Sequence, residues 1–367
     1  MLLLRRVLSH ITEDYLLLTL LLLLSVLLWF NPTTAVGLVA LVDWHIIAAL
    51  AGLMLLSRAL EESGYLARFA AWLLPRCHSE RLLALLMLLF AALLSAIVTN
   101  DVALFILLPI SLSIGRLTGM PVGRLIIFLA LAVNAGSALT PIGNPQNLLL
   151  WQASGHSFWQ FSLMMAPLAL SLLLLVLLLS CLAFGAATLT ITVPHDNSGD
   201  NHRLFVWSLA GYPLFILAME YQFAPIAAIT VLAAYAVFKR SVVTGIDWLL
   251  LLVFMLMFID LGLLAQLPLL QQLAAQLMAL PHGSYNGSAL LSQFISNVPA
   301  AIFLQHFTAD WRALSWGVTV GGFGLAVGSL ANLIALRLSK QPGLWREFHC
   351  WSLPVFLLSL GIGLLIL

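Results

Sequence analysis

Two short polar motifs interrupt long apolar stretches of this chain, and both contain residue types that suit ion binding. The first reads Ser95-Ala-Ile-Val-Thr99-Asn100-Asp101, and the second reads Ser292-Gln-Phe-Ile-Ser296-Asn297-Val298. In each motif four residues separate a serine from an asparagine. Polar side chains cost free energy in hydrocarbon, so clusters of this kind indicate a functional site. Two clusters at matching places in two halves are typical of transporters built from inverted repeats.

Helix starts within apolar sequence provide a second kind of chemistry. A helix that begins inside a bilayer presents unpaired N–H groups and the positive end of its dipole, which bind an anion without Arg or Lys. The sequence predicts such starts at four points: 100–102, 297–299, Asn144 with Pro145, and Ser329. Asn144 is a favourable N-cap, and Pro145 suits the first helical position. Four starts that converge near the midplane would form an anion site.

The same interruptions free backbone carbonyl oxygens, which suit a cation such as Na⁺. Side-chain oxygens of the motifs could complete an oxygen shell near Asn100 and near Asn297, and symmetry would then give one site in each half. No other cofactor is expected. The candidate substrate-binding and ion-binding residues are Thr99, Asn100, Asp101, Thr140, Pro141, Gly143, Asn144, Asn147, Ser296, Asn297, Gly328, Ser329 and Asn332.

Two acidic residues, Asp101 and Asp260, lie deep in apolar sequence and are the candidates for coupling to an ion gradient. Asp101 breaks the symmetry of the two motifs, because Val298 takes its place in the second. It could carry a proton, ligate Na⁺ or only cap a helix. Asp260 could line a pathway or only form a hydrogen bond between helices.

Other polar residues fit structural roles. Arg58, Glu61 and Glu62 have the spacing of ion pairs on one helix, so an interfacial salt-bridge cluster is predicted. The three cysteines are widely spaced and form no CxxC pair, so they predict neither a disulfide nor a metal site; they are Cys77, Cys181 and Cys350.

The composition is that of an integral membrane protein. Of the 367 residues, 62% are hydrophobic and 8% are charged, whereas a soluble domain averages roughly 25% charged. The net charge of +1 argues against a nucleic-acid partner. Arg5-Arg6 followed by the apolar stretch 16–30 could pass for a signal peptide, but no small-residue cleavage site follows, so a retained first span is predicted.

Apolar segments on the scale of a bilayer recur to the end of the chain. The segments 82–117 and 286–309 contain the two motifs near their middles and are interpreted as re-entrant helical hairpins. The segments 123–153 and 312–340 contain Gly-rich or Pro-rich interruptions and are interpreted as broken spanning helices. The other predicted spans are 15–30, 44–60, 158–184, 204–221, 223–238, 247–266 and 350–367.

This reading predicts an all-α polytopic membrane protein with a defined orientation. The positive-inside rule favours a cytoplasmic N-terminus and a periplasmic C-terminus, because all Lys and Arg residues except Arg312 then lie inside. The predicted parts are an N-terminal span (1–42), a first repeat (43–185), a cytoplasmic linker (186–203), two connecting spans (204–240) and a second repeat (241–367).

The two repeats can be aligned by eye. Asp43-Trp44 opens one repeat, and Asp247-Trp248 opens the other. Further on, the first repeat has two glycines and an asparagine that recur at a constant shift in the second; the pairs are Gly136 and Gly321, Gly143 and Gly328, and Asn147 and Asn332. Three spans lie between the repeats, so the second would enter the membrane from the opposite face. This is the pattern of an inverted repeat.

At these motifs the chain resembles the ion transporter superfamily, which includes arsenite permeases, divalent-anion/sodium symporters, citrate-type carriers and some sodium/proton antiporters. It is most similar to YbiR-type bacterial inner-membrane permeases. The resemblance covers the chain from Asp43 onward. The residues that carry it are Thr99-Asn100-Asp101, the run Asn134-Ala-Gly-Ser-Ala-Leu-Thr-Pro-Ile-Gly-Asn-Pro-Gln-Asn147, Ser296-Asn297-Val298-Pro299 and Gly328-Ser329.

The resemblance implies a scaffold domain, often dimeric, and an elevator-like transport domain with two hairpins. In divalent-anion symporters the hairpin tips read Ser-Asn-Thr and bind Na⁺ and a substrate carboxylate. Here the third position is Asp101 or Val298, and the Asn-Asp pair is more similar to an arsenite permease. The expected partners are therefore membrane lipid, a small anion and a second copy of the chain.

The function that follows is secondary transport of a small anion or oxyanion coupled to Na⁺ or H⁺, in the inner membrane. A sodium/proton antiporter is the alternative within the same class. An intramembrane enzyme is disfavoured, because the sequence has no HExxH motif, no paired catalytic Asp motif and no Ser/His pair at one depth. A membrane scaffold or receptor is disfavoured by short linkers and tails.

Overall fold

The computed structural model describes residues 15–65, 68, 79–186, 201–339, 341 and 343–367. Every regular element within these ranges is a helix, which confirms the all-α prediction. The linker predicted at 186–203 and the start of the N-terminal span lie largely outside the described residues, as does Cys77.

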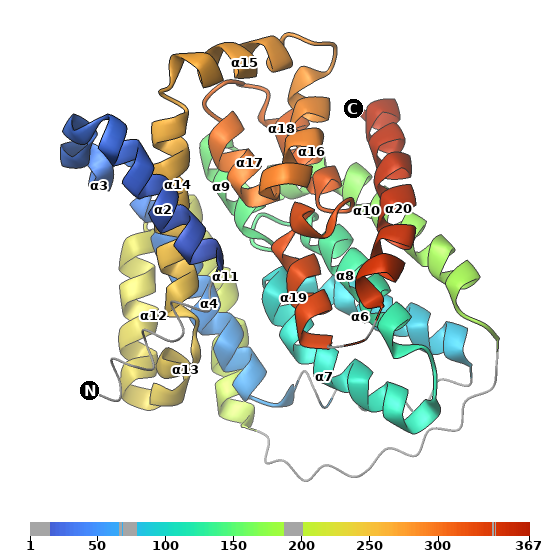
Figure 1. Cartoon of the computed structure of the whole chain (residues 1–367). Helices are drawn as coiled ribbons and strands as arrows, with labels where there is room; N and C mark the ends of the chain where they lie inside the picture. The colour runs from blue at the N-terminus through green and yellow to red at the C-terminus, as the bar shows by residue number, and fades with distance from the viewer. Residues whose placement is uncertain (1–14, 66–67, 69–78, 187–200, 340, 342) are drawn as a thin grey trace.

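The helices form two groups, which stand side by side in Figure 1. In the first group α4 packs against α11 and α12, and α14 packs against α2, α3 and α4. The helices of this group are α2 (Tyr15–Phe30), α3 (Leu38–Leu41), α4 (Trp44–Glu62), α11 (His202–Glu220), α12 (Ala224–Phe238), α13 (Arg240–Gly245) and α14 (Trp248–Leu264), with the 3₁₀ helix η1 (Pro32–Gly37) before α3.

The second group contains both polar motifs. Its helices are α6 (Glu80–Ile97), α7 (Asn100–Thr118), α8 (Val122–Ser137), α9 (Pro145–Ser154), α10 (Phe158–Ala183), α16 (Gly283–Ile295), α17 (Asn297–Leu304), α18 (Trp311–Gly321), η3 (Ala326–Gly328), α19 (Leu330–Ser339) and α20 (Leu344–Ile366). We call α6 with α7 hairpin 1, and α16 with α17 hairpin 2. The connection 138–144 between α8 and α9 is break 1, and the connection 322–329 between α18 and α19 is break 2.

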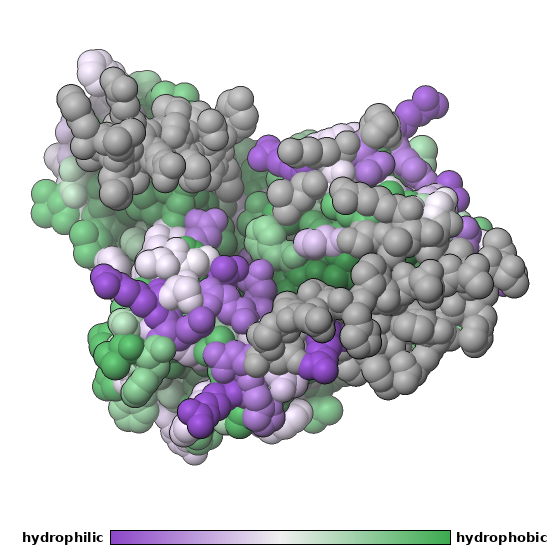
Figure 2. All heavy atoms as spheres, turned by 90° about the horizontal axis from the view of Figure 1, so that it is seen from below, coloured by the Kyte–Doolittle hydropathy of each residue, from purple (hydrophilic) through white to green (hydrophobic). Residues whose placement is uncertain are grey.

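Five described helices are long and apolar enough to cross a membrane, namely α4, α6, α10, α11 and α20. Helix α14 would add a sixth span if it is counted with α15 (Pro268–Met278), from which it is bent by 90°. None of the segments predicted from the sequence covers α15. Figure 2 shows one end of the molecule, where hydrophilic residues gather in patches and hydrophobic residues flank them. The protein is a multi-pass membrane protein.

The start of α4 and the start of α14 share local details. Asp43 accepts a hydrogen bond from the N–H of Ile46 and caps α4, and Asp247 caps α14 in the same way through Leu250. The indole N–H of Trp44 donates to the carbonyl oxygen of Val39 (3.2 Å), and that of Trp248 donates to the carbonyl oxygen of Val243 (2.9 Å). The paired Asp-Trp sequences thus fix equivalent helix starts.

Glycines hold each hairpin against its broken helix. A Cβ at Gly136 of α8 would collide with the backbone of Ala92 in α6, and a Cβ at Gly321 of α18 would collide with the side chain of Ser292 in α16. Both positions therefore need glycine for close helix approach. The hairpins differ in length: α7 has 19 residues and α17 has 8, or about 28 Å and about 12 Å.

Candidate functional site

The tip of hairpin 1 is tied to break 1 through its backbone. Helix α6 ends at Ile97, and α7 begins at Asn100, whose N–H donates to the carbonyl oxygen of Gly143 at 2.9 Å. The side-chain oxygen of Asn100 accepts the N–H of Asp101 at 3.0 Å. Thr99 occupies the N-cap position, but its hydroxyl oxygen does not cap the helix. The first polar motif therefore lies at the interruption between two helices.

Break 1 is held in shape by asparagine side chains. Asn144 caps α9 by accepting the N–H of Asn147 at 2.8 Å, as its position before Pro145 predicts. The side-chain amide of Asn147 donates to the carbonyl oxygens of Ala138 (3.0 Å) and Thr140 (3.2 Å). These bonds satisfy carbonyl groups that the interrupted helix leaves unpaired.

Hairpin 1 and break 1 also meet at Thr140, whose hydroxyl donates to the carbonyl oxygen of Ala96 at 2.6 Å. Pro141 is buried beside it. A Cβ at Gly143 would collide with the carbonyl oxygen of Ser137. Glycine is thus required at the residue that receives the Asn100 hydrogen bond.

The tip of hairpin 2 has a strained backbone. Ser296 adopts a φ of 75°, a region that non-glycine residues rarely occupy and that is common at functional sites. Helix α17 begins directly after it at Asn297. The Asn297 side chain lies beside Gly322 of break 2. A Cβ added to Gly322 would lie 3.3 Å from the Asn297 side-chain nitrogen and 3.6 Å from Cβ of Ser329. The second motif therefore lies at break 2.

Break 2 is also closed by amide side chains. The Asn332 amide donates to the carbonyl oxygen of Gly322 at 2.8 Å, which is the counterpart of the Asn147 bonds at break 1. Gln293 of hairpin 2 donates to the carbonyl oxygen of Gly321 (2.7 Å) and accepts the N–H of Leu325 (2.7 Å). A Cβ at Gly328 would lie 2.5 Å from the carbonyl oxygen of Gly321, so this position is as crowded as Gly143.

The two hairpin–break units are packed against each other. Helix α8 packs on α19, α9 packs on α17 and α18, and α7 packs on α19. Asn134 of α8 crosses between the units, since its amide donates to Asn332 Oδ1 (2.9 Å) and its Oδ1 accepts the hydroxyl of Ser329 (3.0 Å). All thirteen predicted binding residues therefore lie at the two hairpin tips, in the two breaks or in the first turns of α7, α9, α17 and α19.

The two candidate coupling acids lie in different helix groups. Asp101 is half-buried in the first turn of α7 and takes part in none of the ion pairs among the described residues. Asp260 of α14 is completely buried, and neither of its carboxylate oxygens has a hydrogen-bond partner among the described residues. Gly262 faces Leu41 of α3, so Asp260, two residues earlier, points to the opposite side of the helix.

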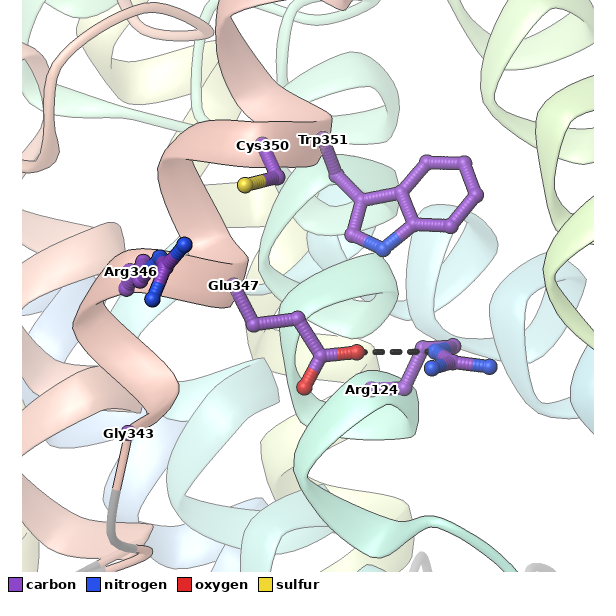
Figure 3. Close-up of a pocket in the computed structure, with 6 residues that line it drawn as sticks. All are labelled: Arg124, Gly343, Arg346, Glu347, Cys350 and Trp351. Atoms are coloured by element: carbon purple, nitrogen blue, oxygen red, sulfur yellow. Dashed lines mark hydrogen bonds and ion pairs between the residues drawn. The ribbon is translucent and has the colours of Figure 1, made fainter.

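A pocket of about 460 Å³ lies between the start of α8 and the start of α20. Figure 3 shows its lining, in which Glu347 of α20 accepts a hydrogen bond from Arg124 of α8 at 2.8 Å. The guanidinium of Arg124 also donates to the carbonyl oxygen of Ala183 at the end of α10 (3.0 Å). Arg124 thus connects the starts of α8 and α20 with the end of α10. The pocket lining contains none of the predicted binding residues.

The remaining sequence-predicted polar groups have structural partners. Arg58 pairs with Glu61 (2.9 Å) and Glu62 (3.2 Å), as their spacing predicts. Glu62 also accepts the hydroxyl of Ser241 (2.7 Å), which links α4 to α13. Cys181 and Cys350 are both free thiols.

Several polar residues at the breaks are not among the thirteen predicted ones. Gln293 and Asn134 hold hairpin 2 and break 2 together, whereas Gln146 and Thr319 are buried and each has an unpartnered side-chain oxygen. The repeat alignment contained the signal for two of them, since it matches Asn134 with Thr319 at the same shift as the glycines. A polar residue at both equivalent positions of two apolar helices indicates a shared role.

The helical fold is that of a polytopic membrane protein, and the family and relatives that it matches are named as transporters and not as enzymes. The model of the CitMHS family, described as a citrate transporter, matches residues 11–321. The chain therefore belongs to the CitMHS family. It is similar to the inner membrane protein YbiR of Escherichia coli, with 46% identity over 341 residues that cover 92% of this chain and 91% of that protein.

More distant relatives carry transporter names as well. An uncharacterized transporter of Methanocaldococcus jannaschii is 30% identical over 317 residues, which cover 86% of each chain. A putative transporter of Dictyostelium discoideum, arsB, is 30% identical over 122 residues, which cover 33% of this chain and 22% of that protein.

Proposed function

We propose that the protein is a secondary active transporter that moves a small anion or oxyanion, coupled to Na⁺ or H⁺. One observation carries this proposal: two helices begin at the hairpin tips and two at the breaks beside them, and no Arg or Lys occurs among the thirteen candidate residues there. Helix N-termini supply N–H groups and positive potential. They would therefore hold an anion and still release it, since they bring no fixed cationic side chain.

An inverted repeat would explain the organisation of this site. The paired Asp-Trp starts and the glycine contacts at Gly136 and Gly321 both support this relation. Alternating access would then come from an elevator-like movement of the second helix group, which contains both hairpins, against the first helix group. Contacts of α14 with α17, and of α4 with α7 and α9, join the two groups and would have to slide.

The setting of this transport is the inner membrane, as the name of the Escherichia coli relative suggests. The distribution of Lys and Arg favours a cytoplasmic N-terminus and a periplasmic C-terminus. Membrane lipid and a small anion would be the partners, and the group that contains α11 and α12 would serve as the scaffold of a homodimer.

A sodium/proton antiporter is the second candidate. Asp101 and Asp260 favour it, because buried carboxylates in membrane proteins often bind protons or cations. In proteoliposomes without added anion, an antiporter would change the internal pH when a Na⁺ gradient is imposed. A symporter would take up anion only in the presence of a cation gradient.

The hairpin-tip site is tested with Asn100→Ala and Asn297→Ala. We expect each variant to express normally and to lose anion uptake in proteoliposomes. Asn286→Ala is the matched control, since Asn286 lies in α16 of the same hairpin as Asn297. Among the described residues its side-chain amide bonds only to the carbonyl oxygen of Pro281 (3.4 Å). Normal uptake by either tip variant would refute the proposed site.

A further inference from the structure

The pocket between the starts of α8 and α20 has more positive than negative charge. Its charged lining residues are Arg124, Arg346 and Glu347. Glu347 is paired with Arg124 at 2.8 Å, whereas Arg346 takes part in none of the ion pairs among the described residues. Figure 3 shows the Glu347 side chain directed at Arg124, with Arg346 on the other side of Glu347. One arginine of the lining therefore has no acidic partner.

Arg124 is fixed in position and still has donors to offer. Its Nε donates to Glu347, and its Nη1 donates to the carbonyl oxygen of Ala183, while its Nη2 makes no hydrogen bond with a described residue. At the same end of α10, Nε of Arg81 donates to the carbonyl oxygen of Phe184 at 3.2 Å. The planar, forked guanidinium group suits the oxygens of a phosphate. The positive charge of the pocket is thus part of a larger basic region.

The face of α20 that carries this charge becomes apolar after its first turns. Arg346 and Cys350 are exposed, and the next exposed residues on that face are Leu353 (39%) and Leu357 (65%), at helical spacings of three and four residues. Leu364 continues the face and is also exposed. A helix face of this kind places its charged start among lipid headgroups and its leucines among acyl chains.

Helix α10, which packs on α20, has an exposed leucine stripe as well. The stripe ends at Leu182, which is 80% exposed and precedes Ala183, the residue bonded to Arg124. Its members recur every four residues and are Leu170, Leu174, Leu178 and Leu182. Two apolar stripes therefore run to the helix ends that Arg124 connects. A free phosphate ion would use only the pocket, whereas a phospholipid would use both the pocket and the stripes.

Trp351 fits the same position in the membrane. It lines the pocket and packs edge-on against Phe128 of α8, with ring centroids 5.1 Å apart. Tryptophan is enriched at the boundary between headgroups and hydrocarbon. The orientation that the Lys and Arg residues favour puts this end of α8 and α20 in the cytoplasmic leaflet, where basic pockets between helices bind the headgroups of anionic lipids.

We propose that this pocket binds the phosphate of an anionic phospholipid through Arg346 and Arg124, with the acyl chains along the leucine stripes of α10 and α20. Phosphatidylglycerol is the simplest such lipid, since its single negative charge matches the one arginine without an acidic partner. The bound lipid would join the starts of α8 and α20 to the end of α10. This inference goes beyond the proposed function and does not depend on the substrate.

The test measures thermal unfolding of purified, delipidated full-length protein in a non-ionic detergent. Phosphatidylglycerol is compared with phosphatidylethanolamine of the same acyl chains, which has no net charge, and with inorganic phosphate, which has no chains. Arg346→Gln removes the arginine that has no acidic partner. Arg337→Gln is the matched control, because Arg337 is an exposed arginine in the last turn of α19 and does not line the pocket.

We expect phosphatidylglycerol to raise the unfolding temperature of the wild-type protein, and phosphatidylethanolamine and inorganic phosphate to leave it unchanged. Arg346→Gln should weaken the apparent affinity for phosphatidylglycerol about fivefold, the contribution of one arginine near an anionic lipid. Arg337→Gln should bind phosphatidylglycerol like the wild type.

A second measurement needs no variant, so the test stays valid if Arg346→Gln does not fold. Cys350 is an exposed free thiol in the pocket lining. Bound lipid should cover it, so phosphatidylglycerol should slow its reaction with a maleimide, followed by mass spectrometry of the labelled peptide. Phosphatidylethanolamine of the same chains should not slow this reaction.

Four results would each overturn the inference. Equal stabilisation by the two lipids would exclude recognition of charge, and equal stabilisation by inorganic phosphate would indicate an ion site without a lipid. Unchanged affinity in Arg346→Gln, or an equal loss in Arg337→Gln, would place the binding outside the pocket. Labelling of Cys350 at the same rate with and without phosphatidylglycerol would exclude a lipid that covers the pocket.

Discussion

The backbone N–H of Asn100 donates to the carbonyl oxygen of Gly143 at 2.9 Å, so the tip of hairpin 1 and break 1 form one structural unit. The bond connects residues from two different helix pairs, and it uses main-chain atoms that every substitution except proline at position 100 leaves in place. Hairpin 2 is attached differently, through the side chain of Gln293. The two units are therefore equivalent in position but depend on different chemical groups.

The stability of the protein should fall more when Gln293 of hairpin 2 is replaced by an apolar residue than when Thr140, which bonds to hairpin 1, is replaced. Gln293→Leu would leave the carbonyl oxygen of Gly321 and the N–H of Leu325 unpaired, at about 1–3 kcal/mol for each buried group. Thr140→Val would leave one group unpaired, the carbonyl oxygen of Ala96. We expect Gln293→Leu to lower the unfolding temperature about twice as much. Equal shifts would contradict this account.

Gly136→Ala should destabilise the protein by about 1–3 kcal/mol, because the added Cβ collides with the backbone of Ala92, which cannot rotate away. Gly361→Ala in α20 is the control, since a Cβ there meets no atom within 4 Å. Thermal unfolding of both purified variants measures the effect. A Gly136 variant as stable as the Gly361 variant would mean that α6 and α8 are less closely packed than described.

Asp260→Leu should stabilise the protein. The carboxylate is completely buried and has no hydrogen-bond partner among the described residues, so its removal should relieve a desolvation cost of about 1–3 kcal/mol. If Asp260 takes part in coupling, the same variant should lose gradient-driven transport. A large fall in unfolding temperature would instead show that the carboxylate has a structural partner.

Asp101→Asn should change coupling and leave stability unchanged. The side chain is half-buried and forms no ion pair with a described residue, and the bond from its N–H to Asn100 Oδ1 does not need a carboxylate. We expect near-normal thermal unfolding together with an altered dependence of transport on pH and Na⁺. Unchanged dependence on both ions would refute a coupling role for Asp101.

Local sequence signals predicted most of the helices and the interruptions at which the candidate residues lie. Apolar length predicted the spanning helices α4, α10, α11 and α20, whereas the predicted spans at α2 and α12 are shorter apolar helices. Asn144 with Pro145 predicted the start of α9, and the paired Asp-Trp sequences predicted the starts of α4 and α14. Helix α15 was missed because it is too short and too polar to resemble a span. Gly136 and Gly321 were recognised because they recur at the same shift in the two halves. Their packing partners, Ala92 and Ser292, could not be predicted, because they lie on other helices.

The sequence by itself determined an all-α membrane protein with two polar interruptions in each half, because hydrophobic length and cap residues act over a few neighbouring positions. Only the tertiary structure decided which oxygen atoms have donors. Asn134 and Asn332 are far apart in the chain, and their bond forms because α8 packs on α19. A hydrogen bond depends on distance and direction in space, so the difference between the two hairpin–break units arises at that level.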